Sequence, residues 1–148
     1  MTRTVALLVL TTALAAASAF AAAAPRFRPG LWELETSTPG SKLKPQVVQR
    51  CYAAADVGIA NGTTAEANAF AKKDANMKAL EQKGCKMKEL RIAGDEVIQT
   101  FQCASYSMKD VTTYHRGDTF DSVLTVDHGN GRLQTSLTKG RRVSDCVK

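Results

Sequence analysis

Four cysteines carry the chemistry that is easiest to interpret in this sequence: Cys51, Cys85, Cys103 and Cys146. An even number of cysteines is typical of a disulfide framework in an oxidising compartment. Structural zinc sites and thioredoxin-like redox sites use closely spaced pairs such as Cys-x-x-Cys. No pair in this chain has that spacing. We therefore predict two structural disulfides, with no metal site and no cofactor.

Clusters of basic side chains are the second chemical feature. The chain has a formal net charge of +6 at pH 7. One group lies between residues 72 and 91 and a second at 141–142, and clustered positive charge raises the local concentration of anions. A solvated basic surface that keeps the protein soluble is the alternative. The candidate anion-binding face consists of Lys72, Lys73, Lys83, Lys86, Lys88, Arg91, Arg141 and Arg142.

No residue pattern predicts a catalytic site. His115 and His128 are the only histidines, and no Gly-x-Ser-x-Gly nucleophile elbow or glycine-rich phosphate loop is present. Glu33 and Glu35 alternate along a predicted strand, which is typical of solvated carboxylates. The single tryptophan, Trp32, is expected to anchor the core. The sequence therefore favours a protein that is not an enzyme, without deciding the question.

The first 24 residues have the pattern of a signal peptide. Arg3 precedes the apolar run Val5–Leu10, and small residues that fit a cleavage site follow at 17–19 and 21–23. The run has too few strong hydrophobes for a transmembrane anchor. We predict a signal peptide over residues 1–24, with an approximate cleavage site, and a single disulfide-stapled domain over residues 25–148. The processed protein would lie in a bacterial periplasm or be secreted.

The mature sequence predicts β-strands around one helix. The helix is expected over 64–83, because Thr63 and Glu66 have capping-box spacing and Gly84 suits a left-handed C-cap. A polar loop is expected over 56–63, and Lys139-Gly140 is expected to break the last strand. The fold class is mainly antiparallel β with one helix (α+β), a curved meander sheet that is open or partly closed into a barrel. About seven strands are expected, over 31–36, 46–52, 85–92, 96–103, 111–116, 119–126 and 132–138.

The predicted hairpin around Gly94 bears on the disulfide connectivity. If Ala93-Gly94-Asp95 is a three-residue loop, Cys85 faces Cys103 at a distance that suits a disulfide. Cys51 would then pair with Cys146. A two-residue Gly94-Asp95 turn would shift the register by one residue and remove the facing pair. The other connectivities therefore stay open.

The mature chain resembles a family of secreted bacterial proteins known as domain of unknown function 3617. The resemblance rests on Pro29-Gly30-Leu31-Trp32-Glu33 directly after the leader, on the cysteine layout, and on Arg141-Arg142-Val143-Ser144-Asp145-Cys146. Ser144 departs from the pattern, because glycine is common at that position. The resemblance implies export, one domain and paired cysteines. It implies no activity.

These observations favour a non-catalytic exported module that binds a ligand or associates with the envelope. Its expected partners are anionic envelope components or another envelope protein, and not nucleic acid, which is rare outside the cytoplasm. A structural or protein-interaction domain that docks a partner on a sheet edge is the alternative. A small hydrolase or redox enzyme has the least support, because its motifs are missing.

Overall fold

One large antiparallel sheet forms the framework of the protein. The computed structural model describes residues 24–147, so the predicted signal peptide over residues 1–24 lies outside the described residues except for Ala24. The seven strands have the order β2-β1-β7-β6-β5-β4-β3, which confirms the mainly antiparallel prediction. The strands are β1 (Gly30–Ser37), β2 (Gln46–Tyr52), β3 (Lys86–Ala93), β4 (Glu96–Gln102), β5 (Ser107–His115), β6 (Thr119–Asp127) and β7 (Leu133–Ser144).

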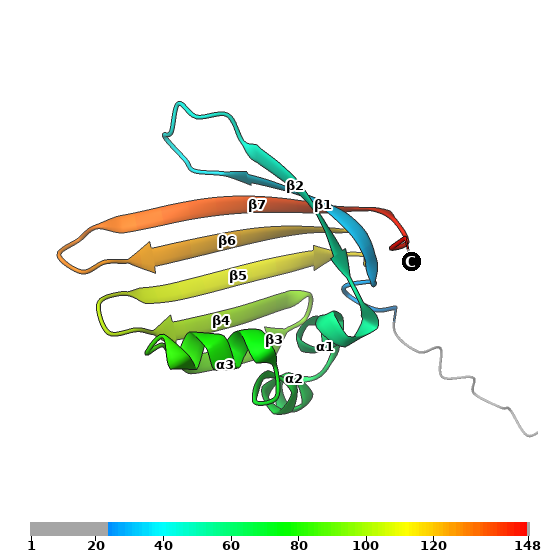
Figure 1. The fold of residues 1–148 in the computed structure, drawn as a ribbon, viewed down its shortest axis with the longest axis horizontal. Helices are drawn as coiled ribbons and strands as arrows, with labels where there is room; N and C mark the ends of the chain where they lie inside the picture. The colour runs from blue at the N-terminus through cyan, green and yellow to red at the C-terminus, as the bar shows by residue number, and fades with distance from the viewer. Residues whose placement is uncertain (1–23, 148) are drawn as a thin grey trace, which may run out of the picture.

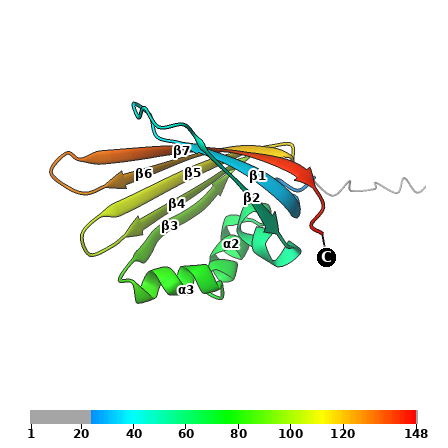
Figure 2. The ribbon, with the colours of Figure 1, turned by 45° about the horizontal axis from the view of Figure 1, so that its top comes forward.

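The sheet is open. Strands β3 to β7 follow one another as a meander, whereas β1 lies between β2 and β7 (Figure 1). β2 and β3 are the two edges and do not pair with each other, so a barrel does not form. All the helices lie on one face of the sheet, which we call the inner face (Figure 2). Among residues 24–147, no helix combines the length and apolar character needed to cross a membrane.

The prediction of one helix over 64–83 is wrong. The segment forms two helices, α2 (Thr64–Ala71) and α3 (Ala75–Gln82). The break occurs at Asp74, whose extended backbone and side chain cap α3 by accepting hydrogen bonds from the amides of Asn76 and Met77. A short acidic side chain competes in this way with helix continuation. The predicted capping box at the start of α2 is present, and Gly84 has the expected positive φ of 80°.

The predicted polar loop over 56–63 is also wrong, because most of it is helical. A 3₁₀ helix, η1 (Ala54–Val57), runs into the single-turn helix α1 (Gly58–Asn61). Val57 and Ala60 are 6% and 4% exposed and belong to the core. Asn61 accepts a hydrogen bond from the Phe27 amide at 2.9 Å and donates one to its carbonyl at 2.7 Å. Packing of these few apolar residues therefore orders a segment whose composition suggests a loop.

Two disulfides, Cys51–Cys146 and Cys85–Cys103, have the predicted connectivity, although the hairpin has the other turn. Ala93 pairs with Glu96, so the connection is the two-residue turn Gly94-Asp95. A register shift between Met87 and Glu89 then adds one residue to β3. This β-bulge offsets the shorter turn and leaves Lys86 opposite Gln102. Cys85, directly before Lys86, and Cys103, directly after Gln102, are therefore brought together.

Two strand boundaries differ from the prediction by four residues or more, at the start of β5 and the end of β7. β5 begins at Ser107, four residues before the expected start at Val111. β7 runs without a break through Lys139-Gly140. The glycine is required there by packing, because a Cβ atom at position 140 would lie 2.1 Å from the ring of Phe120. Glycine inside a strand commonly marks such a close approach rather than a strand end.

The core lies between the inner face and the helices. Trp32 is 0% exposed, as predicted, and packs with Phe27 at a ring-centroid distance of 4.5 Å. Phe120, Tyr114 and Tyr52 surround this pair as partly buried rings. A second buried cluster joins α2 to the sheet through Ala67, Ala71, Leu90 and Val97. Helix α3 has no buried residue and so contributes none to the buried part of either cluster.

Candidate functional site

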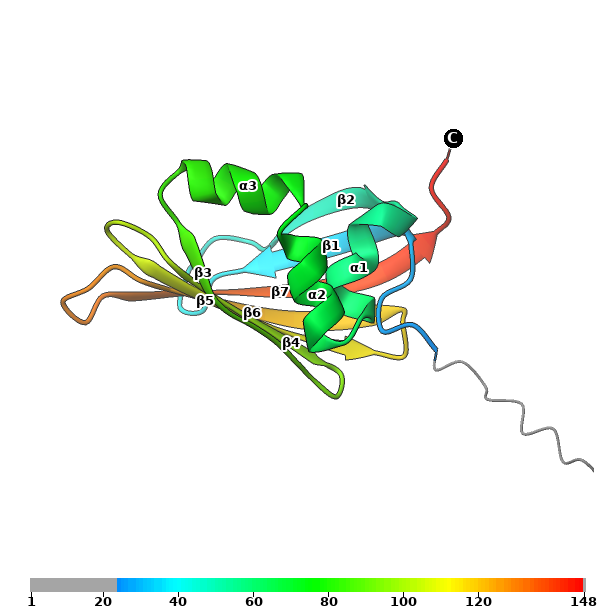
Figure 3. The same ribbon diagram turned by 90° about the horizontal axis from the view of Figure 1, so that it is seen from below.

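A groove separates α3 from the edge of the sheet, and it is the main candidate for a functional site. Figure 3 shows α3 lying over the inner face beyond α2. The helix is held at its start by the Asp74 cap and at its end by the Cys85–Cys103 disulfide. The space between α3 and β3 has a volume of about 500 Å³, and we call it the α3 groove. Its apolar lining includes Ala71, Met77, Leu80, Met87, Leu90 and Phe101.

Methionine gives the α3 groove an adaptable surface. Met77 projects from α3 and Met87 from β3, and both are half-buried. Met108 lines the neighbouring cavity of about 240 Å³, which shares Met77, Leu80 and Phe101 with the groove. Methionine side chains are flexible and polarisable and are frequent at surfaces that accept varied apolar partners. The arrangement suits an apolar chain better than a rigid polar molecule.

Lysines line the mouth of the groove. Lys72 follows α2, and Lys86 and Lys88 lie on β3; all three are exposed and line the groove. Two carboxylates, Glu81 and Glu89, share this lining. Glu89 is paired with Arg91 at 3.1 Å, so its charge is already compensated. The mouth therefore presents an excess of ammonium groups above an apolar floor.

The structure does not unite the predicted basic residues in one face. Lys73 and Lys83 are exposed beside the α3 groove but do not line it, and Arg91 is engaged with Glu89. Arg141 and Arg142 lie on β7, an interior strand separated from β3 by β6, β5 and β4. The face predicted from the sequence is therefore two separate groups in space.

A half-buried carboxyl group, that of Asp110, lies on the inner face and was not predicted as a site residue. Asp110 on β5 accepts a hydrogen bond from the Ser122 hydroxyl at 2.6 Å and one from the Thr112 hydroxyl at 3.3 Å. Burial raises the pKa of the Asp110 carboxyl above its ordinary value, and the two hydroxyl groups only partly offset this effect. The alternation of Met108, Asp110, Thr112 and Tyr114 along β5 was the signal that places this carboxyl inward.

The two histidines lie away from the α3 groove. His115 is on the outer face, where its Nε2 atom lies 2.9 Å from an Asp121 carboxylate oxygen, and both side chains are about half exposed. His128 follows β6 in the turn before β7, near the ring of Tyr106. Within the described part of the chain, no three His, Cys, Asp or Glu side chains are placed to hold a metal ion.

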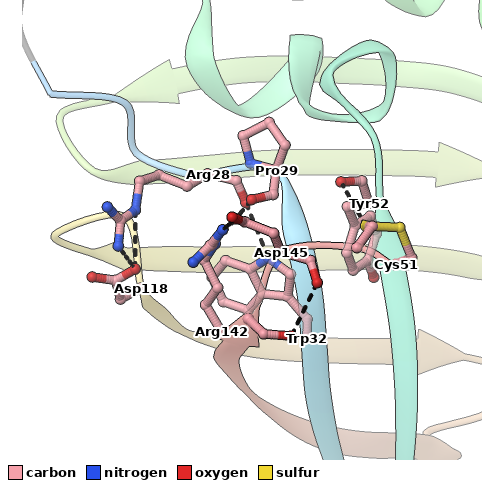
Figure 4. A network of polar contacts seen from close by, with 10 residues as sticks. Arg28, Pro29, Trp32, Cys51, Tyr52, Asp118, Arg142 and Asp145 are labelled. Atoms are coloured by element: carbon pink, nitrogen blue, oxygen red, sulfur yellow. Dashed lines mark hydrogen bonds and ion pairs between the residues drawn. A yellow bond between two sulfur atoms is a disulfide. The ribbon is translucent and has the colours of Figure 1, made fainter. Parts of the chain in front are cut away.

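The opening motif and the last residues of the chain meet at one end of the sheet. Arg142, whose side chain is 19% exposed, donates a hydrogen bond from Nε to the Pro29 carbonyl at 2.9 Å and pairs with Asp145 (Figure 4). Trp32 donates from its indole nitrogen to the Arg28 carbonyl at 3.0 Å. The Cys51–Cys146 disulfide lies beside this network. The segments that carry the sequence motifs are thus joined physically.

The fold and the groove define a class of protein: an open antiparallel sheet, cross-linked by two disulfides, with helices over one face and an amphipathic groove beneath them. The model of the family described as "Protein of unknown function (DUF3617)" matches residues 27–146, so the chain belongs to this family, as its motifs predict. No curated protein and no solved structure matches the chain.

Proposed function

We propose that this protein is an exported, non-catalytic binding module that holds an anionic amphiphile in the α3 groove. The observation that carries the proposal is the pairing of a methionine-rich apolar lining with lysines at the mouth. An acyl-like chain would lie against Met77, Leu80 and Phe101. Its carboxylate or phosphate would remain near Lys86 and Lys88, which are exposed enough to stay hydrated.

Export is supported by two features of the chain. The leader pattern over residues 1–24 is typical of secretion. All four cysteines are paired in disulfides, which persist in oxidising compartments such as the bacterial periplasm. A groove ligand in that compartment would be an anionic component of the envelope, such as a lipid.

A binding role is supported by the side chains that line the α3 groove. They include lysines, glutamates and one asparagine, but no histidine and no serine or threonine among the described residues. Cys85 also lines the groove, but it is held in a disulfide. The groove therefore offers apolar surface and charge to a ligand, and it lacks the usual nucleophile–base pairing of a hydrolase.

Titration with dodecanoic acid tests the proposal. The triple variant Lys72→Ala, Lys86→Ala, Lys88→Ala should bind this probe roughly three- to one-hundredfold more weakly, because each exposed ion pair is worth about 0.2–1 kcal/mol. Binding by the natural sequence should also weaken as the salt concentration rises. Calorimetry, at probe concentrations below micelle formation, provides the measurement.

The matched control removes the same charge elsewhere. Lys42, Lys44 and Lys139 are exposed and lie outside the α3 groove. Their triple alanine variant should bind dodecanoic acid like the natural sequence. The proposal fails if the natural sequence does not bind dodecanoic acid, or if the control variant loses as much affinity as the groove variant.

A further inference from the structure

A second cavity on the inner face has the opposite electrostatic character to the mouth of the α3 groove. It has a volume of about 290 Å³ and lies against Asp56, Asp110 and four aromatic rings. It shares Gln99, Asp110, Ser122 and Thr138 with the 240 Å³ cavity that continues beneath α3. No Lys, Arg or His from the described residues lines either of these two cavities. The aromatic rings belong to Phe27, Tyr52, Tyr114 and Phe120.

Asp110 is the unusual member of this lining. Its hydrogen-bond donors, Ser122 and Thr112, are neutral hydroxyl groups, and no Lys, Arg or His forms an ion pair with it among residues 24–147. Asp56, by contrast, is occupied at the start of η1, where it accepts a hydrogen bond from the Ala53 amide at 2.7 Å. Asp110 is half-buried, and withdrawing a carboxylate from water without a cation is costly unless a partner is supplied.

The aromatic rings favour the same kind of partner. The negative face of an aromatic ring attracts ammonium groups, and such cation–π contacts strengthen where water is excluded. One ring of the set already makes a contact of this type, because the Arg50 guanidinium lies 4.9 Å from the centroid of Tyr52. Tyr114 and Phe120 lie 5.8 Å apart between their centroids and share the inner face with Asp110.

We infer that the cavity between Asp110 and the rings of Tyr52, Tyr114 and Phe120 binds an organic ammonium group. The ammonium donates hydrogen bonds to Asp110, while the chain attached to it lies along the apolar residues beneath α3. This inference goes beyond the proposed function, because the ammonium site and the lysine mouth have separate linings. A ligand with both charges would reach both sites through the shared cavity.

Octylammonium and 1-octanol, which have the same chain, separate charge recognition from apolar binding. The natural sequence should bind octylammonium more tightly than octanol. Asp110→Asn should weaken octylammonium binding by about tenfold or more, since a hydrogen bond to a charged group is worth about 1.5–3 kcal/mol. Octanol binding by the same variant should be unchanged, which also shows that the variant is folded. Calorimetry measures the affinities, and NMR amide shifts should change in residues 110–114 and 120–124.

Asp121→Asn is the matched control, because it makes the same substitution on the outer face of β6, next to His115. It should bind octylammonium like the natural sequence. The inference is overturned if octylammonium and octanol bind equally, if Asp110→Asn has no effect, or if the amide shifts map only to the lysine mouth. Asp110→Asn keeps the lysines on which dodecanoic acid binding depends. Its binding of dodecanoic acid therefore tests the proposed function separately from the ammonium site.

Discussion

At the scale of single residues, the opening motif has a steric explanation. Gly30 has a φ of +145°, and a Cβ atom there would lie 2.6 Å from both Nε of Arg142 and the Ser144 carbonyl oxygen. Glycine is required twice, by backbone conformation and by the approach of the arginine. The glycine of the motif at residues 29–33 therefore allows the last strand, β7, to pack against the first, β1. It does not describe a site with chemistry of its own.

Gly30→Ala should lower the free energy of unfolding by about 2–6 kcal/mol, because strain and overpacking each cost about 1–3 kcal/mol. Gly40→Ala is a suitable comparison. Gly40 also has a positive φ, of 76°, but its Cβ would have no neighbour within 4 Å. That variant should lose only about 1–2 kcal/mol from backbone strain. Urea denaturation measures both values, and equal losses would argue against the Arg142 contact.

Asp110 links the proposed ammonium site to pH-dependent stability. Because burial raises its pKa in the folded protein, the folded state binds more protons than the unfolded chain above the ordinary pKa of 3.8. The contribution of Asp110 to stability is therefore fully present below that pH. It is lost as the pH rises through the folded-state pKa.

Asp110→Asn removes this titration and should be more stable than the natural sequence at pH 7. The difference between the two proteins should shrink as the pH falls towards 4. Urea denaturation across pH 4–7 gives the comparison, with Asp121→Asn as the control on the outer face. A stability difference that stays constant with pH would contradict the assignment. A residue that costs stability and remains accessible to a cavity is consistent with a binding role.

Strand alternation can place Asp110 on the inner face, but the sequence alone could not identify it as a site residue. An isolated aspartate between Lys109 and Val111 is indistinguishable in composition from a solvated strand residue. Its importance comes from Ser122 on the next strand and from rings that belong to distant segments. By contrast, the cysteines and the opening motif were informative, because their residue types have few alternative uses in an exported chain.

At the scale of secondary-structure elements, strand pattern was predicted better than local breaks. Alternating apolar residues gave the strands, and β2 has the predicted bounds of 46–52. The β3–β4 turn and the continuation of β7 depend instead on contacts across the sheet. The bulge between Met87 and Glu89 offsets the two-residue turn, and Gly140 accommodates the ring of Phe120. Neither compensation has a signature in the local sequence.

The two disulfides connect elements at very different separations, 95 residues for Cys51–Cys146 and 18 residues for Cys85–Cys103. In the chain-entropy description, the longer loop gives the greater stabilisation. Replacing Cys51 and Cys146 by serine should therefore lower the free energy of unfolding by about 3–5 kcal/mol, and replacing Cys85 and Cys103 by about 2–3 kcal/mol. Urea denaturation of the two double variants tests this order, and a reversed order would contradict it.

At the scale of the whole molecule, positive and negative side chains lie at different ends of the inner face. Lysines lie at the α3 end, where the groove opens, and Asp110 lies beneath the aromatic cluster near the other helices. The apolar residues between them include Met77, Leu80 and Phe101. The net charge of +6 can be counted from the sequence, but it does not show this separation of charge. Only the folded sheet brings the relevant residues to one surface.

The position of β1 between β2 and β7 has a consequence for the order of assembly. Strands β3 to β7 can form stepwise through hairpins between neighbours, each closing a short loop. β1 is made earlier, yet one of its two partners is the last strand of the sheet. The amino-terminal hairpin therefore cannot dock on the sheet until β7 is complete, and until then the edge of β1 that pairs with β7 is open to misassociation.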